Sequence, residues 1–141
     1  MGHVFLKSGI IFNPASSLQP GALDFTYEWY MRYNGTSANW DILRGIDNGN
    51  TSLRAQITTT GGMIIDLNGT NTLNCAVTLS TNELHHVAIC RFNNLLTVYV
   101  DGIQVGTRLF NFDIKFSELR LFHRDIAHQS IPTVFYSWRI S

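Results

Sequence analysis

The segment from Glu83 to Phe92, which reads ELHHVAICRF, carries an acid, two adjacent histidines and a cysteine within ten residues. These are the residue types of metal sites and of nucleophilic active sites. His85 and His86 are neighbours in the chain, however, and successive side chains on a strand point to opposite faces of the sheet. We therefore expect that they do not share a metal ion. His85 is better explained as a structural histidine, hydrogen-bonded to a nearby backbone or hydroxyl group.

A second group of polar residues has the composition of a ligand site. The segment Asp47-Asn48-Gly49-Asn50 offers carboxylate and amide oxygens, which calcium prefers in loops, but it lacks the continuation of a full calcium loop. A plain turn is the first interpretation, and bound calcium is the alternative. Trp40, which lies beside Asn39 and Asp41, has the shape to stack on a sugar ring, although packing in the core also explains a tryptophan. The candidate ligand-binding residues are thus Asn39, Trp40, Asp47, Asn48 and Asn50.

Catalytic patterns are absent from the sequence. A sandwich glycosidase presents two carboxylates within about 5 to 10 Å of each other, often by alternation along one strand. The three glutamates, Glu28, Glu83 and Glu118, are instead isolated in sequence. Nor does the chain contain a G-x-S-x-G elbow, an H-E-x-x-H helix motif or a phosphate-binding glycine loop. We expect no enzymatic activity and no required cofactor.

Composition and charge narrow the class of partner. The chain has 141 residues, of which 45% are hydrophobic and 14% charged, and its formal net charge is zero. This is typical of one packed domain over residues 1–141. Without a cluster of Lys and Arg, nucleic acid and membrane surfaces are not expected partners. The first residues lack the apolar run of a signal peptide, which leads us to expect synthesis and retention in the cytoplasm.

The elements that position these residues are strands. Apolar residues alternate with polar ones almost everywhere, and Gly, Asn, Asp, Ser and Thr gather between the apolar runs. The only place where one helical turn fits is 125–130. We predict strands near 9–13, 24–33, 40–46, 52–58, 62–67, 72–79, 84–92, 95–100, 103–109, 117–122 and 133–140.

Two short turns fix the register of the region from 82 to 106. Asp101-Gly102 and Asn93-Asn94 suit two-residue hairpin turns, which need positive φ at both central positions. The resulting pairs are Phe92 with Leu95, Ile89 with Val98, Val87 with Val100, Val100 with Ile103, and Val98 with Val105. Hydrophobic patterning selects the same register. One face of this meander, made of Val87, Ile89, Val98, Val100, Ile103 and Val105, is predicted to face the core.

The two cysteines are predicted to be free thiols. Neither belongs to a C-x-x-C pair. A turn at 80–83 that joined strands 72–79 and 84–92 would place Cys75 opposite Ala88 and Cys90 opposite Leu73. The two sulfurs would then be diagonal neighbours, too far apart for an easy disulfide.

Several motifs resemble one family. DFTYEWYMR (24–32) is similar to the "DFTIEAWVR" strand of laminin-G-like, concanavalin A-like lectin/glucanase domains, and LHHVAICR (84–91) is similar to their "WHHVAVVR". LTVYVDGIQVG (96–106) resembles "LTLYVDGVLVG", and SWRIS (137–141) resembles the closing "DEVRIS" strand. The resemblance implies an all-β fold, a jelly-roll sandwich of two antiparallel sheets. It also implies binding more than chemistry, because the matched motifs are scaffold motifs.

Three functional hypotheses follow from this resemblance. The first is a bacteriophage-type virion protein, a capsid-decoration or tail-associated module that contacts protein subunits of a larger assembly and is incorporated in the particle. The second is a free-standing lectin that binds a cell-surface glycan, and the third, more remote, is a glycoside hydrolase. A homo-oligomer is compatible with the first two. We favour a non-enzymatic binding or structural module, with the virion protein slightly ahead of the lectin.

Overall fold

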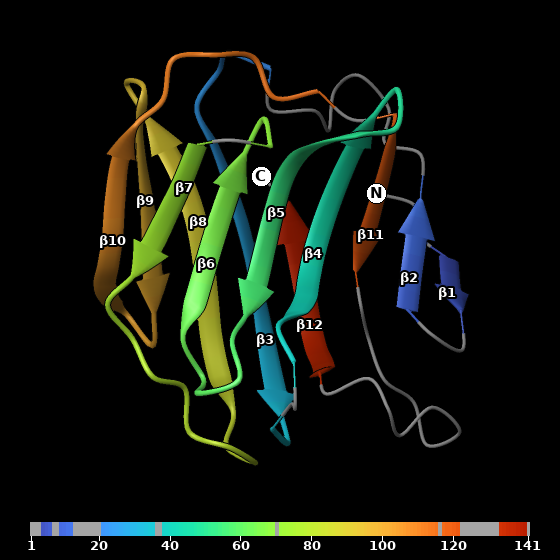
Figure 1. Ribbon diagram of the computed structural model, residues 1–141, viewed down its shortest axis with the longest axis vertical. Helices are drawn as coiled ribbons and strands as arrows, with labels where there is room; N and C mark the ends of the chain where they lie inside the picture. Colours follow the sequence, from blue (N-terminus) through green and yellow to red (C-terminus); the bar gives the residue numbers. More distant parts are fainter. Residues whose placement is uncertain are drawn as a thin grey trace.

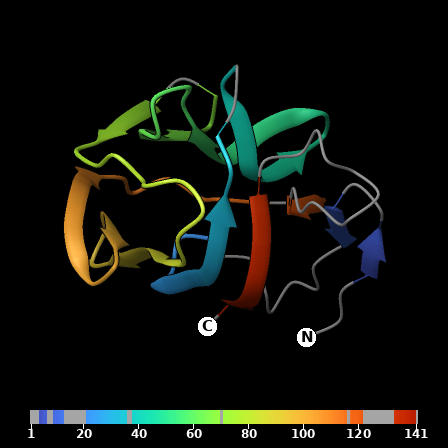
Figure 2. The same ribbon diagram turned by 90° about the horizontal axis from the view of Figure 1, so that it is seen from below.

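The computed structural model describes residues 4–6, 9–12, 21–35, 38–69, 71–115, 117–121 and 133–140. They form two antiparallel sheets that lie face to face, with the seven-stranded sheet in front in Figure 1 and the two layers seen end-on in Figure 2. Across the first sheet the strands are β1 (Val4–Leu6), β2 (Gly9–Phe12), β11 (Glu118–Leu121), β4 (Trp40–Asp47), β5 (Asn50–Ile57), β6 (Met63–Leu67) and β7 (Asn71–Cys75). Across the second they are β10 (Ile103–Leu109), β9 (Leu95–Val100), β8 (His85–Phe92), β3 (Phe25–Tyr33) and β12 (Thr133–Ile140).

This architecture confirms the two-sheet antiparallel β-sandwich predicted from the sequence. The described residues contain no helix, and thus no helix that is long and apolar enough to cross a membrane. Strand β1 was not predicted. The predicted helical turn at 125–130 lies outside the described residues.

The core lies between the sheets and follows from alternation along each strand. In β3, every second side chain from Phe25 to Tyr33 is buried, because successive side chains point to opposite faces. Each fully buried aliphatic or aromatic side chain contributes about 1.5 to 3 kcal/mol to the free energy of unfolding. The largest buried apolar side chains are Tyr27, Trp29, Met31, Ile42, Leu43, Leu53, Ile57, Met63, Ile65, Leu67 and Ile89.

The predicted hairpin between β8 and β9 is confirmed. Asn93 and Asn94 have φ angles of 49° and 66°, which is the positive-φ pair that a two-residue turn requires. Phe92 lies opposite Leu95, and the other two predicted pairs between these strands also form. At the next hairpin, Asp101 has a φ of 53° and Ile103 lies opposite Val100, again as predicted.

Strand β10 departs from the predicted register after its first two residues. A β-bulge between Gln104 and Gly106 places Gly106, not Val105, opposite Val98. The predicted pair of Val98 with Val105 is therefore wrong, although Val105 remains buried. Ile103 was predicted to face the core, yet its exposed fraction is 67%. It lies beside the turn on the outermost strand of its sheet, where a side chain has strand neighbours on one side only.

The predicted strand at 72–79 is wrong in its length and its partner. Strand β7 ends at Cys75 and pairs with β6, so that Cys75 lies opposite Met63 and not opposite Ala88. Residues 76–84 instead cross from one sheet to the other. Both cysteines are free thiols, as predicted, but the reason is that they belong to different sheets.

The Arg91 side chain links chain segments at one end of the sandwich through hydrogen bonds to their carbonyl oxygens. Its side chain is buried, and its Nε and Nη2 donate to the carbonyl oxygen of Leu23 at 3.1 and 3.0 Å. Nη1 donates to the carbonyl of Phe112 at 2.8 Å, and Nη2 also donates to that of Gly21. The guanidinium lies over the ring of Phe25, with 5.2 Å from Cζ to the ring centroid. Desolvation lowers the pKa of Arg91, and the charges of Asp113 and Asp24 oppose this effect.

Candidate functional site

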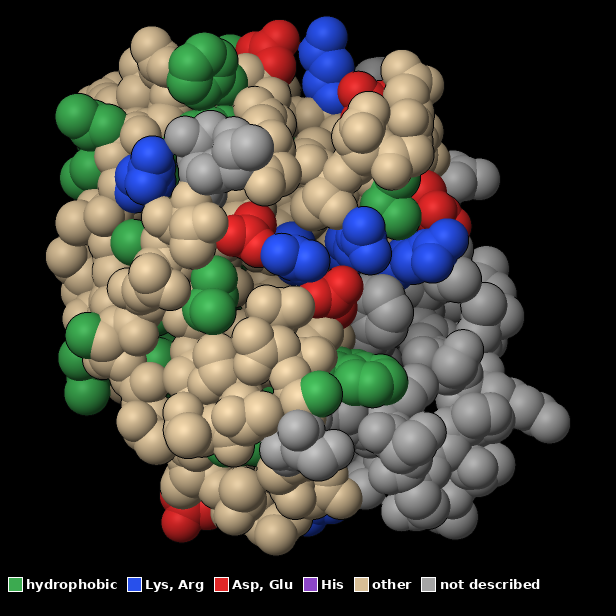
Figure 3. All heavy atoms as spheres, in the orientation of Figure 1, with side chains coloured by type: hydrophobic (Ala, Val, Ile, Leu, Met, Phe, Trp, Pro, Cys, Tyr) green, Lys and Arg blue, Asp and Glu red, His purple; other side chains and the backbone are tan. Residues whose placement is uncertain are grey.

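Polar side chains form a row across the outer face of the seven-stranded sheet. The register places Arg120 (β11) opposite Arg44 (β4), Arg44 opposite Arg54 (β5), Arg54 opposite Asp66 (β6), and Asp66 opposite Thr72 (β7). Residues directly opposite each other project from the same face of a sheet. Figure 3 shows this face, with a band of basic and acidic side chains across its middle. We call Arg120, Arg44 and Arg54 the arginine row.

Asp66 closes one end of the row. Its Oδ2 accepts from Arg54 Nε at 2.9 Å and also from Arg54 Nη2, while its Oδ1 accepts from the Thr72 hydroxyl at 2.8 Å. A carboxylate that is this fully bonded and nearly buried fixes the Arg54 side chain along the sheet. The pair therefore gives the site a rigid edge.

The other two arginines have fewer bonds. Arg44 Nε donates to Thr51 Oγ1 at 2.9 Å, and its Nη1 lies 3.8 Å from Asp41 Oδ2. Arg120 Nη2 donates to Glu118 Oε2 at 3.1 Å. Its Nε is buried and has no hydrogen-bond partner among the described residues. Both guanidinium groups thus retain donors that are not used within the described part of the chain.

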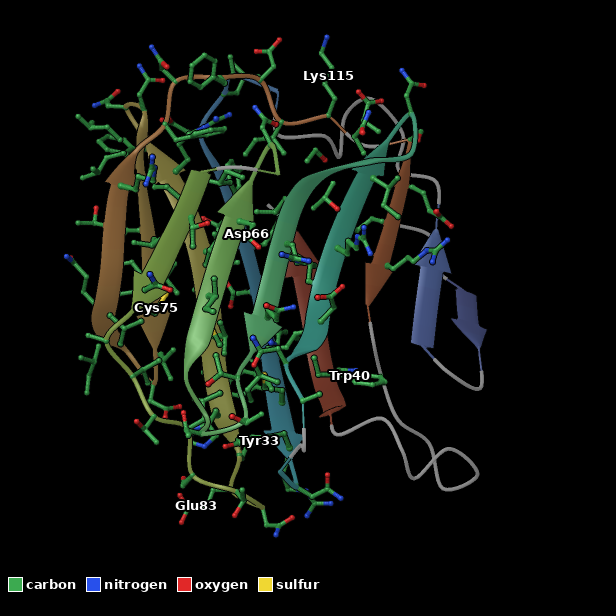
Figure 4. The ribbon with its side chains drawn as sticks, in the orientation of Figure 1. Tyr33, Trp40, Asp66, Cys75, Glu83 and Lys115 are labelled. Atoms are coloured by element: carbon green, nitrogen blue, oxygen red, sulfur yellow. The ribbon has the colours of Figure 1, made fainter. Side chains whose placement is uncertain are left out.

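A depression lies beside the row, at the start of β4. Its volume is about 300 Å³, and it is lined by Asn39, Trp40, Asp41, Arg54 and Gln56. Gln56 Nε2 donates to Asp41 Oδ1 at 3.1 Å, and the same oxygen lies 3.9 Å from Arg54 Nε. Figure 4 shows Trp40 beside the start of β4, and Asp66 farther along the sheet on β6. We call this depression the Trp40 pocket.

Trp40 has the two environments that a ligand platform needs. Part of its side chain packs against the core, which fixes the ring, and the residue is only half-buried. Its indole Nε1 is buried without a hydrogen-bond partner among the described residues. Core packing and partial exposure thus occur together at Trp40, which contacts the core and also lines the pocket.

A second depression lies at the other end of β4. Its volume is about 200 Å³, and its lining residues are Asp47, Asn48, Asn50, Thr51, Ser52 and Asn68. The positive φ angles of Asn48 and Gly49, 49° and 79°, make this a tight hairpin turn, as the sequence indicated. The candidate residues thus divide between two depressions. Asn39 and Trp40 line one, and Asp47, Asn48 and Asn50 line the other, about 20 Å away along the strand.

The hairpin depression does not fit calcium. Calcium takes six to eight oxygen ligands, and its affinity depends on how many of them are charged. Asp47 is the single carboxylate among the lining residues, and no group of three His, Cys, Asp or Glu side chains occurs among the described residues. The backbone turn itself explains Asn48 and Asn50, with Asn50 Nδ2 donating to the Asn48 carbonyl at 3.4 Å.

Sequence reasoning missed the residues that surround Trp40 in space. Arg54 and Gln56 alternate with buried Leu53, Ala55 and Ile57, so the sequence LRAQI already places them together on an outer face. Which strand flanks them is not visible in that pattern. Asp41 follows Trp40 in the chain, whereas Arg44 enters the site because β4 pairs with β5 in the observed register.

The histidines diverge as expected, and His85 is a structural residue. His85 is buried, and its Nε2 lies 2.9 Å from the Ser80 carbonyl oxygen and 3.2 Å from Ser80 Oγ. This confirms the predicted backbone and hydroxyl partners. A further partner was not predicted, since His85 Nδ1 lies 2.8 Å from Asp101 Oδ2.

The Ser80, His85 and Asp101 side chains have the residue types of a catalytic triad, but the hydrogen bonds oppose that chemistry. A triad histidine must accept the serine proton at Nε2. Here the nearer partner of Nε2 is the Ser80 carbonyl, which can only accept, so Nε2 carries a proton. Burial alone lowers the pKa of His85, but the hydrogen bonds to Asp101 and Ser80 and the charges of Asp101 and Glu83 outweigh it and raise the pKa above its usual value. The geometry is that of an imidazolium held between two acceptors.

His86 points to the outer face of the five-stranded sheet. Its ring lies against Tyr30, with the centroids 4.7 Å apart, and its Nε2 lies 3.3 Å from Glu28 Oε1. Tyr30 has an exposed fraction of 43%. Tyr30 and His86 thus provide an aromatic surface on the outer face of the five-stranded sheet, which does not contain Trp40.

The sequence corresponds to a known family. The sequence model of the concanavalin A-like lectin/glucanases superfamily matches residues 7–125. Among curated proteins, none matches the sequence.

Solved structures of lectin-like domains superpose on most of the chain. A galectin from Caenorhabditis elegans matches with a TM-score of 0.67 at 8% identity, over 94% of this chain and 90% of the galectin. The CBM40 domain of the Ruminococcus gnavus IT-sialidase, bound to α2,3-sialyllactose, matches with a TM-score of 0.64 at 17% identity, over 96% and 85%. The binding domain of botulinum neurotoxin DC, in complex with SialylT, matches with a TM-score of 0.70 at 14% identity, over 93% of this chain and 35% of that one. At such low identities the likeness concerns the fold alone.

Proposed function

Because the chain belongs to the concanavalin A-like lectin/glucanases superfamily, we propose that it is a non-enzymatic binding module whose ligand is a saccharide held in the Trp40 pocket. The site lies at the start of β4, where Trp40 packs against the core and also lines the pocket. A preformed platform of this kind binds with little loss of conformational entropy.

The composition of the Trp40 pocket carries this proposal. A sugar ring has an apolar face and a rim of hydroxyl groups, so it needs an aromatic surface together with donors and acceptors. The pocket supplies an indole from Trp40, amides from Asn39 and Gln56, a carboxylate from Asp41 and a guanidinium from Arg54. The bond between Gln56 and Asp41 holds two of these groups in place before any ligand arrives.

The structural neighbours support the same class of ligand. One is a galectin, one is a carbohydrate-binding domain solved with sialyllactose, and one is a toxin binding domain solved with SialylT. These ligands belong to those proteins, and their shared fold makes a saccharide the first class to test for this chain.

The absence of glycosidase activity is part of the proposal. The family includes glucanases as well as lectins, so the family alone does not decide the question. Glycoside hydrolysis needs two carboxyl groups that are free to exchange protons or attack the sugar. Among the described residues, Asp41 is the one carboxylate that lines the Trp40 pocket, and the nearby Asp66 has both oxygens bonded to Arg54 and Thr72.

A place in a phage-type virion stays a prediction from the sequence. A saccharide site is compatible with it, because a module on a particle can bind a cell-surface glycan. Mass spectrometry of purified particles is the direct test. High copy number in the particle supports a virion protein, and absence from particles leaves the free-standing lectin as the remaining form of the proposal.

Binding to a glycan array, followed by titration calorimetry with the best ligand, tests the saccharide site. We expect Trp40→Ala to weaken binding about ten-fold or more, since buried aromatic contacts dominate binding energy. Gln56→Ala, which leaves the core unchanged, should weaken it by a smaller factor. The matched control is Tyr30→Ala, which removes an exposed aromatic ring from the other sheet. An array without any signal, or equal binding by Trp40→Ala and the unmodified chain, contradicts the proposal.

A further inference from the structure

The arginine row places like charges side by side on the outer face of a sheet. Arg120 faces Arg44 directly across the sheet, and Arg44 faces Arg54. Like charges at directly opposite positions destabilise a sheet. The side chains lie on the outer face, with exposed fractions of 36% for Arg44, 32% for Arg54 and 41% for Arg120. Packing of the core therefore does not require them.

The charges of the row are compensated unevenly. Asp66 lies directly opposite Arg54 and binds it through two nitrogens. Arg44 and Arg120, in contrast, have no acid directly opposite them in the register. Asp41 approaches Arg44 only to 3.8 Å, and Glu118 takes one terminal nitrogen of Arg120. The neighbouring pair of Arg44 and Arg120 is thus the part of the row whose donors are not all used within the described part of the chain.

We propose that Arg44 and Arg120 form a subsite for an anionic group, a carboxylate or a sulfate ester, carried by the saccharide. This inference rests on the proposed saccharide site and names the class of its ligand. Two planar guanidinium groups side by side suit such a group, because each donates charge-assisted N–H bonds to its oxygens.

The Trp40 pocket and the anionic subsite are adjacent, and Asp41 orients the ligand between them. Asp41 Oδ1 accepts from Gln56 on the pocket side, and its Oδ2 is the oxygen 3.8 Å from Arg44 Nη1. Its negative charge repels an anionic group from the pocket itself while accepting sugar hydroxyls there. The ring of the saccharide therefore lies in the pocket, and its anionic group lies over Arg44 and Arg120.

Matched pairs of acidic and neutral saccharides test this subsite on the full chain. The array contains sialylated glycans beside their desialylated forms, uronate oligosaccharides beside their methyl esters, and sulfated glycans beside unsulfated ones. We expect the acidic member of at least one pair to bind about ten-fold more tightly, as hydrogen bonds to charged groups imply. The preference should fall as sodium chloride rises, since salt screens exposed charges. Whether sialylated, uronate or sulfated pairs respond distinguishes a carboxylate from a sulfate.

Variants connect the preference to named residues. Arg44→Gln and Arg120→Gln should each remove most of it while leaving binding of the neutral member within about two-fold. Lys115→Gln is the matched control, because it removes the same charge from an exposed side chain on the upper rim of Figure 4, away from Trp40. Circular dichroism of each variant verifies the fold.

The possible results separate the subsite from the saccharide site. Binding that depends on Trp40 without preference for the acidic member overturns the anionic subsite and leaves the proposed function standing. A preference for acidic glycans that persists in both arginine variants also overturns the subsite. Absence of saccharide binding by the unmodified chain overturns both.

Discussion

Asp101 shows how much a single turn residue can do in this fold. Its φ of 53° suits the tight turn that the sequence predicts at Asp101-Gly102. Its carboxylate also bridges two neighbouring groups of β8, since Oδ1 accepts from the His86 backbone N–H at 2.9 Å and Oδ2 lies 2.8 Å from His85 Nδ1. Burial alone raises the pKa of Asp101, but these hydrogen bonds and the charges of the two histidines lower it overall. Asp101 thus joins the β9–β10 turn to the start of β8.

The pair of His85 and Asp101 predicts a defined dependence of stability on pH. The raised pKa of His85 means that its contribution is complete below the unfolded value of 6.5 and is lost as the pH rises through the folded pKa. The lowered pKa of Asp101 means that its contribution is present above the unfolded value of 3.8 and is lost as the pH falls through the folded pKa. The pair therefore stabilises the fold most between those two values.

Asp101→Asn tests this dependence, because asparagine retains the turn geometry and the acceptor for His86 while removing the charge. Urea unfolding should show a loss of about 1 kcal/mol near pH 5, a modest value because half of the Asp101 side chain is exposed. The loss should shrink toward pH 9. Asp113→Asn, which removes an exposed charge elsewhere, should show no such trend. A loss that is equal at all pH values would mean that the charge of the pair does not matter.

At the scale of elements, the crossing segment 76–84 determines how the two sheets are joined. The Leu79 backbone N–H donates to the Gly61 carbonyl at 2.8 Å, and the Tyr33 hydroxyl donates to the Leu79 carbonyl at 2.7 Å. Gly61 belongs to the turn between β5 and β6, whereas Tyr33 ends β3 in the other sheet. Leu79 is buried between them. Leu79 of the crossing segment is therefore hydrogen-bonded to both sheets, once through each of its backbone groups.

Gly61→Ala should disrupt this junction. A Cβ at this position would lie 2.5 Å from the Tyr33 hydroxyl oxygen and 2.6 Å from the Leu79 carbonyl oxygen, and its φ is +84°. We expect a loss of at least about 3 kcal/mol in the free energy of unfolding, from strain together with overpacking.

Gly49→Ala is the control for backbone strain. Gly49 has a similar φ of +79°, but nothing lies within 4 Å of a Cβ there. Its alanine variant should lose only about 1 kcal/mol, the cost of positive φ. Equal losses for the two variants in urea denaturation would show that the contact with Tyr33 and Leu79 is unimportant.

Bulges explain why the site could not be assembled from the sequence. A regular hairpin about Asn48-Gly49 would place Arg44 opposite Leu53, but a shift at Gly45 and Ile46 places it opposite Arg54. One extra residue in a strand thus creates the arginine row. Neither the hydrophobic alternation nor the turn residues of the sequence indicate where an extra strand residue occurs, because both patterns are compatible with one.

At the scale of the whole molecule, the features predicted correctly from the sequence are those that turn residues and hydrophobic patterning determine. The β8–β9 hairpin was correct in detail because Asn93-Asn94 and the valine-rich face agree on one register. The partner of β7 was wrong because neighbouring strands usually pair, whereas this chain crosses between sheets after Cys75. Asn39 and Trp40 line the same depression because they are adjacent in sequence, as is Asp41. Arg54 and Gln56 complete the pocket through the pairing of β4 with β5, which a single sequence does not reveal.

The last prediction is that the thermal stability of this fold does not depend on a bound metal ion. The affinity of calcium depends on how many of its ligands are charged, and the hairpin depression offers Asp47 alone. A metal present at about a thousand times its dissociation constant would add about 4 kcal/mol, which corresponds to a rise of roughly 10 °C in Tm for a domain of this size. We therefore expect EDTA and excess calcium to give the same Tm in differential scanning calorimetry, within about 1 °C. A calcium-dependent rise of several degrees would contradict this, and Asp47→Asn would then show whether the hairpin holds the ion.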